Sequence, residues 1–232
     1  MSPDVVLWAR GPFHPYRRQA AWFRELAARQ GLTLAWSRNV DVLEPASIEV
    51  VRAVIIAGTH WRDVTSLSVD AWIDGEPVTT VYDSPSDDGW SALRSGVASG
   101  SLGLLVFHAG IGSFDDRPDF ASLIDGRWIH GQSSHTEIHR ITVVPTREHS
   151  IVRDLPAFST HDELWDDIVL PRESVILLTV TEGGRSIPVA WSSREDEQTR
   201  RIAITLGHDM RTCSTPAFST FVSRSIAWLA NR

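Results

Sequence analysis

Residues 103–110 read Gly-Leu-Leu-Val-Phe-His-Ala-Gly, an apolar run that stops at a histidine between small residues. Such an uninterrupted run is typical of a strand buried on both faces, as in a parallel sheet. The small residues near its end favour a sharp turn that presents the next side chain close to backbone N–H groups at a helix start. His108 at this turn is therefore predicted to act as a base, an acid or a ligand. A histidine that only hydrogen-bonds a loop is the alternative.

The first part of the chain alternates strand patterns with helical spacing. Strands are predicted at 5–9, 32–36 and 53–57, with a helix at 20–30. This alternation indicates parallel strands, whose carboxyl ends carry the functional loops. We expect three loops to gather at that edge, namely 10–14, 59–61 and 108–114.

The pattern changes along the rest of the chain. Residues 70–72 are predicted helical and 78–82 a strand, before a helix at 87–99 and the strand 102–107. Four further strands are expected as antiparallel additions to the sheet edge, at 137–144, 175–180, 187–191 and 201–206. Pro216 begins a final helix. The sequence thus predicts one α/β domain over residues 1–232, with a mostly parallel central sheet and antiparallel additions in the C-terminal half.

Charge and cysteine content argue against several classes of protein. The 232 residues carry a formal net charge of -7, and the arginines are scattered among carboxylates. No nucleic-acid partner is expected, because phosphate binding needs a basic stripe. Cys213 is the only cysteine, so no intramolecular disulfide can form and a cytoplasmic location is expected. No membrane partner is expected either, since no apolar run approaches the roughly 20 residues of a spanning helix. A homo-oligomer is compatible with the sequence.

Two more segments carry groups that could join His108. Leu206-Gly207-His208-Asp209 ends another apolar run with a histidine, and His161-Asp162-Glu163 sets two carboxylates side by side. Neighbours in an extended segment point to opposite faces, so only one carboxylate is expected in a pocket, and we favour Glu163. A solvated acidic turn is the alternative.

Histidines follow three of the predicted strands. His60, His108 and His208 would converge if these strands share a sheet, and Glu163 would complete an acid/base set or a divalent-metal site. The spacing matches no strong zinc motif, because the sequence has neither HExxH nor paired cysteines. The cofactor therefore stays open. If a metal is present, His108, Glu163 and His208 are its expected ligands.

Several segments also resemble a known family when they are taken in order. They are 103–109, Gly126-Arg127-Trp128 with a following histidine, His149 before 155–158, 162–165, 188–191, 201–208 and Ala227-Trp228. This series resembles the ThuA-like family, named for trehalose utilisation. The resemblance implies a flavodoxin-like, class I glutamine amidotransferase-like three-layer sandwich. The chain departs from the family in its approach to His108, which is not rich in glycine, and in the absence of proline after His130 or His135.

The resemblance implies a role in sugar catabolism, where family members are linked to keto-sugars. We expect an enzyme for a sugar or keto-sugar derivative, a lyase, isomerase or hydrolase, in which His108, Glu163 and His208 act as acid/base or metal-binding groups. The residues expected to bind the sugar are His14, His60, Trp61, His135, Trp165 and Asp209. A non-catalytic sugar-binding or interaction module on the same fold is the alternative. Glutamine hydrolysis is not expected, because it needs a thiolate where His108 stands.

Overall fold

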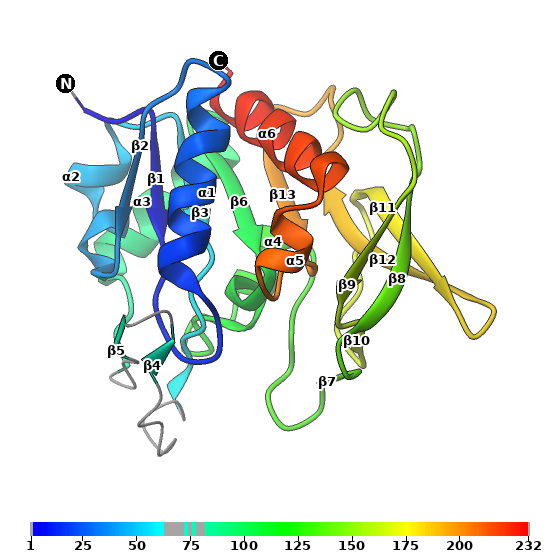
Figure 1. Ribbon diagram of the computed structural model, residues 1–232. Helices are drawn as coiled ribbons and strands as arrows, with labels where there is room; N and C mark the ends of the chain where they lie inside the picture. Colours follow the sequence, from blue (N-terminus) through cyan, green and yellow to red (C-terminus); the bar gives the residue numbers. More distant parts are fainter. Residues whose placement is uncertain (1, 63–71, 74–75, 78–81, 232) are drawn as a thin grey trace.

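A computed structural model describes residues 2–62, 72–73, 76–77 and 82–231 (Figure 1). In these residues one large sheet has the strand order β2-β1-β3-β6-β13-β12-β11-β8-β9. Its parallel half consists of β1 (Val5–Trp8), β2 (Leu34–Ser37), β3 (Ala53–Ile56), β6 (Gly103–Phe107) and β13 (Arg201–Ile204). Its antiparallel half consists of β8 (His139–Pro145), β9 (Phe158–Asp162), β11 (Val175–Glu182) and β12 (Arg185–Ser192).

Two small pairs of strands lie outside this sheet. They are β4 (Trp72–Ile73) with β5 (Glu76–Pro77), and β7 (Ser134–His135) with β10 (Trp165–Asp166). Both pairs are antiparallel. The second pair matters for function, because it brings His135 opposite Trp165.

Helices cover both faces of the parallel half, as Figure 1 shows. One face carries α1 (Tyr16–Ala28), α5 (Met210–Cys213) and α6 (Pro216–Ala230). The other carries α2 (Pro45–Ile48), α3 (Asp87–Ala98) and α4 (Phe120–Ile124). The 3₁₀ helices η1 (Val40–Leu43) and η3 (His108–Gly112) connect some of these elements. Of the helices in the described residues, none has the length and apolar character that a membrane crossing requires.

The residues of β6 explain why the sheet has helices on both sides. Leu105 and Phe107 belong to the core under α1 and α6, whereas Leu104 and Val106 belong to the core under α2 and α3. A strand buried on both faces needs apolar residues at every position, which is what the run at 103–107 supplies. The predicted three-layer α/β fold is confirmed, since the parallel strands follow one another in the flavodoxin-like order.

One prediction about the sheet was wrong. Residues 201–206 were expected among the antiparallel additions, but β13 pairs in parallel with β6 and antiparallel only with β12. An apolar run such as Ile202–Ile204 fits either pairing, so the pattern alone does not give the direction. The strand is the fifth of the parallel set, and it carries His208 to the same edge as His108.

The bounds of the other elements differ less from those predicted. The first helix begins at Tyr16, earlier than expected, and α3 is capped by Ser86, whose side chain accepts a hydrogen bond from the Gly89 backbone. Of the helical prediction at 70–72, Trp72 lies in β4 and the other two residues lie outside the described residues. Of the strand predicted at 78–82, only Tyr82 is described, and it has no regular structure.

Candidate active site

A pocket of about 450 Å³ opens at the carboxyl ends of the parallel strands. The loop after β1 contributes His14, the loop after β3 contributes Thr59, and η3 after β6 contributes His108. The antiparallel half closes one side with Glu163 and Trp165. The volume and the mixed aromatic and polar lining are those of a small-molecule site.

His108 is the first residue of η3 and follows β6 directly. Its φ of 46° lies in the left-handed region that residues with a side chain rarely adopt, so the chain turns sharply here. The ring is buried, and its Nδ1 lies 2.5 Å from the carbonyl oxygen of Thr205. Because a carbonyl oxygen only accepts, we assign the hydrogen of the neutral ring to Nδ1. The lone pair then lies on Nε2.

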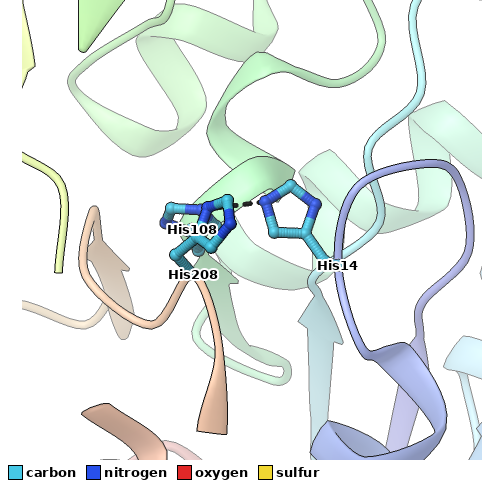
Figure 2. Close-up of side chains that lie close together, drawn as sticks. All are labelled: His14, His108 and His208. Carbon is cyan, nitrogen blue, oxygen red and sulfur yellow. Dashed lines mark hydrogen bonds between the residues drawn. The ribbon is translucent and has the colours of Figure 1, made fainter. Parts of the chain in front are cut away.

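His14 and His208 bring their rings to the same place from other loops, as Figure 2 shows. Nε2 of His14 lies 3.0 Å from Nε2 of His108. The opposite nitrogen of His14, Nδ1, lies 3.2 Å from the carbonyl oxygen of Pro12 and 3.0 Å from the hydroxyl of Thr59. One ring nitrogen from each of the three histidines lies within 4.8 Å of the other two. We call His14, His108 and His208 the histidine trio.

Glu163 is the carboxylate of the pocket and is almost fully buried. Its Oε1 accepts a hydrogen bond of 2.7 Å from the indole of Trp165 and lies 3.6 Å from Nε2 of His108. Its Oε2 lies 3.2 Å from Nδ1 of His208 and 3.2 Å from Nδ1 of His135. The His208 contact is short enough for an ion pair, but Nδ1 of His208 has no directed hydrogen bond in the described residues.

Asp162, the neighbour of Glu163, turns away from the pocket and forms hydrogen bonds with backbone groups. It accepts hydrogen bonds from the N–H groups of Gly207, at 2.6 Å, and His208, at 3.3 Å. Gly207 has a φ of 111°, and a Cβ there would lie 2.1 Å from the ring of Phe107, so only glycine fits. Asp162 therefore positions the loop that carries His208.

Burial and neighbouring charges separate the protonation states of the cluster. Burial lowers the pKa of both His14 and His108, although Glu163 opposes the shift in each. Burial alone would raise the pKa of Glu163, but its contacts with His208 and His108 outweigh burial and bring that pKa to about 2. Burial would lower the pKa of His208, but contact with Glu163 raises it overall. Glu163 is thus ionised at neutral pH, whereas the imidazoles of His14 and His108 are neutral.

His60 does not join the other strand-ending histidines, contrary to the expected convergence. It is buried, but its Nε2 accepts a hydrogen bond from the Asp83 backbone, and its ring stacks on Tyr82. Adjacent residues of an extended segment point to opposite sides, and here Thr59 is the one that faces the trio. His14 takes the place that was expected for His60.

Of the other residues predicted to bind the sugar, some line the pocket and one does not. Trp61, His135 and Trp165 line the pocket, where Trp61 stacks on His130 with ring centroids 4.9 Å apart. Asp209 is not among the lining residues. Its side chain instead caps α5 and pairs with Arg211.

Two groups that position the histidines of the pocket were not predicted from the sequence. Asp162 was considered but not chosen, and the carbonyl of Thr205 gives no sequence signal because every residue has one. The adjacent carboxylates of 162–163 were the available signal for Asp162. Which of the two carboxylates accepts hydrogen bonds from backbone N–H groups depends on the position of the loop after β13, and that position is known only from the fold.

Comparisons with known proteins agree with this fold. The model of the ThuA family, described as trehalose utilisation, matches residues 4–229. A ThuA-like protein of Parabacteroides merdae is 15% identical with a TM-score of 0.74, over 100% of this chain and 91% of that one. A ThuA-like protein of Bacteroides uniformis is 13% identical with a TM-score of 0.68, over 98% and 92%.

A larger enzyme contains a similar fold as one part. The β-galactosidase of a Rahnella species is 8% identical with a TM-score of 0.60, over 97% of this chain but only 31% of that enzyme. At such identity the likeness concerns the fold alone. No curated protein matches the chain. The family match covers nearly all of the sequence, and the chain therefore belongs to the ThuA family, whose description is trehalose utilisation.

Proposed function

We propose that this protein is an enzyme that acts on a sugar or keto-sugar derivative by proton transfer in the pocket. One observation carries the proposal: an ionised, buried carboxylate, Glu163, contacts histidines inside a cavity walled by tryptophans. Buried carboxylates in contact with histidines are frequent at reaction centres, because each group changes the proton affinity of the other. The family description, trehalose utilisation, supports a carbohydrate as the substrate.

The tryptophans supply the binding surface of the proposed site. The rings of Trp128 and Trp165 meet edge to face, with centroids 4.9 Å apart, and Trp61 lines the same pocket. The C–H faces of a sugar pack well on such rings, while its hydroxyl groups need polar partners such as Glu163.

The proposed reaction begins at a carbon next to a keto group. Glu163 or a neighbouring imidazole accepts the proton from that carbon, which leaves an enediolate. In an isomerase the proton returns to the adjacent carbon, and in a lyase a substituent leaves from the next carbon instead. A hydrolase would use the same groups to activate water.

Glutamine hydrolysis does not fit this pocket. The only cysteine, Cys213, is buried in α5 and is not among the described residues that line the pocket. Burial also raises the pKa of its thiol well above the ordinary value, which disfavours the thiolate that such a reaction needs. A buried free thiol is compatible with the reducing cytoplasm, where we propose that the protein works.

The test is exchange of substrate hydrogen with solvent. Trehalose, simple glucosides and their keto derivatives are incubated with the protein in D₂O, and proton NMR follows deuterium uptake next to the carbonyl. We expect uptake with at least one keto derivative, and Glu163→Gln should slow it about 100- to 10,000-fold, the usual contribution of a general base. Calorimetry on the same variant checks that the sugar still binds.

Glu182→Gln is the matched control, because Glu182 also contacts a histidine, His139, but is exposed at the end of β11 and is not among the described residues that line the pocket. This variant should exchange hydrogen like the wild type. The proposal fails if no derivative exchanges or reacts, or if Glu163→Gln is as fast as the wild type. Tight sugar binding without any exchange or product would instead establish the non-catalytic binding module.

A further inference from the structure

The two closest nitrogens of the histidine trio face each other in an unusual way. Nε2 of His14 and Nε2 of His108 lie 3.0 Å apart. Nδ1 of His108 donates to the carbonyl of Thr205, and Nδ1 of His14 lies against the carbonyl of Pro12. Nδ1 of His14 also lies 3.0 Å from the hydroxyl of Thr59 and 3.1 Å from that of Tyr16. With hydrogens on both Nδ1 atoms, two lone pairs point at one another, an arrangement that a cation between them stabilises.

A shared proton could join two nitrogens, but it would not explain the third. A ring nitrogen of His208 lies within 4.8 Å of the ligand nitrogens of both other histidines. Three imidazole nitrogens that converge from three separate loops match the donor set of a metal ion better than that of a proton.

We propose that His14, His108 and His208 bind a divalent transition-metal ion, with Zn²⁺ as the first candidate. Imidazole nitrogen is a preferred ligand of zinc, and three protein ligands with one open position are typical of catalytic zinc sites. Zinc–nitrogen bonds of about 2.0 Å in a tetrahedron would separate the nitrogens by about 3.3 Å. The 3.0 Å between His14 and His108 is close to that separation.

The surroundings of the trio have the form of an outer ligand shell. Metal-bound histidines usually donate their second N–H to a carbonyl or a carboxylate, which fixes the ring. Thr205 and Pro12 offer carbonyls to His108 and His14, and Glu163 lies 3.2 Å from Nδ1 of His208. His14 thus replaces Glu163 in the ligand set expected from the sequence.

A metal at the trio would give each residue of the pocket a separate role. The role of the ion in the reaction rests on the proposed function. The trio would hold the metal, whose open position would take a hydroxyl or keto oxygen of the sugar. Proton transfer would then fall to Glu163, which is not a ligand. Metal binding itself needs no sugar and can be measured alone.

The experiment uses the full chain, purified without a metal-affinity tag and stripped with a chelator. The stripped protein is titrated with Zn²⁺ by calorimetry and with Co²⁺ by visible absorption, whose intensity reports tetrahedral coordination. We expect one ion per chain. His14→Gln, His108→Gln and His208→Gln should each weaken binding by more than ~100-fold, beyond the usual effect of losing an outer-shell partner.

His149→Gln is the control, because His149 is as buried as His108 but contacts Glu195 and Trp228, outside the pocket. It should bind Zn²⁺ like the wild type. The proposal is overturned if the wild type binds neither ion, or if folded His14→Gln binds Zn²⁺ as tightly as the wild type. Circular dichroism establishes that each variant is folded.

A second measurement covers the case in which His14→Gln does not fold. Wild-type protein is treated with diethyl pyrocarbonate with and without Zn²⁺, and mass spectrometry reads the modification of each histidine. Zn²⁺ should protect His14, His108 and His208 but not the exposed His161. A trio histidine that is modified in the metal-free protein and to the same extent with Zn²⁺ would contradict the site. Zinc binding without any reaction on sugars would refute only the proposed function, and undiminished reaction by metal-free protein would refute only the part assigned to the ion in that reaction.

Discussion

Asp162 and Glu163 are adjacent at the end of β9, yet they serve two different regions of the molecule. Asp162 faces the loop after β13 and accepts hydrogen bonds from the backbone of Gly207 and His208. Glu163 faces the pocket, and its carboxylate contacts side chains of the described residues, including Trp165. Both are buried. The difference teaches that burial alone does not mark a chemical role, since a buried carboxylate can either fix the backbone or remain available to a ligand.

The largest difference in stability should appear when each carboxylate becomes an amide. Asp162→Asn replaces a charged acceptor of backbone N–H groups and turns one of its atoms into a donor. We expect it to lower the free energy of unfolding by about 2 kcal/mol, the usual value for hydrogen bonds to a charged group. Glu163→Gln should cost less than about 1 kcal/mol, because its amide can still accept from Trp165. Urea unfolding of both variants measures this, and the reverse order would refute the division of roles.

His108 allows a similar comparison within one residue, because its side chain serves the pocket while its backbone conformation favours glycine. Its ring belongs to the pocket, while its φ of 46° is strained for any residue with a Cβ. His108→Gly should therefore be more stable than His108→Ala by about 1 kcal/mol, although glycine usually destabilises.

Ala109, the next residue of η3, has no positive φ and provides the reference. Ala109→Gly should lose about 0.5 to 1 kcal/mol, the ordinary cost of glycine. If the glycine variant at 108 is the less stable of its pair, the turn stores no strain at this position. Thermal unfolding of the three variants and the wild type decides this.

The smallest effect concerns the exposed counterpart of the buried carboxylate. The pKa of His139 is raised, first by the Glu137 carbonyl and also by Glu182, against the opposing effect of burial. Glu182→Gln should lower this pKa, which NMR titration of the ring can follow. Because the folded pKa is the higher one, the stabilisation is complete below the unfolded value of about 6.5 and is lost as pH rises through the folded pKa. An unchanged or higher pKa in the variant would contradict the contact with Glu182.

Much of the architecture can be predicted from local patterns. The run at 103–107 gives a strand buried on both faces, and the helical spacing of Trp22, Phe23 and Leu26 gives the core of α1. Alternation along β9 puts only one of two adjacent carboxylates in the pocket. These inferences succeed because each depends on neighbours in the sequence.

The predictions that missed depend on residues far apart in the chain. The parallel direction of β13 follows from its pairing with β6, about which its own residues say nothing. His14 meets His108 because Gly11 and Phe13, both with positive φ, turn the loop after β1 back over the strand ends. The next histidine along, His60, faces the other way after β3. No spacing rule contains that information.

The hydrogen bond between His108 and Thr205 joins residues 97 positions apart, and the contact between His14 and His108 joins residues 94 apart. Long-range parallel pairing closes large loops before it gains contacts, so it is slow to form during folding. The pocket consequently cannot exist in a partly folded chain that has not yet paired β6 with β13. We expect ligand-binding ability to return in the last kinetic phase of refolding, after most helical signal has recovered.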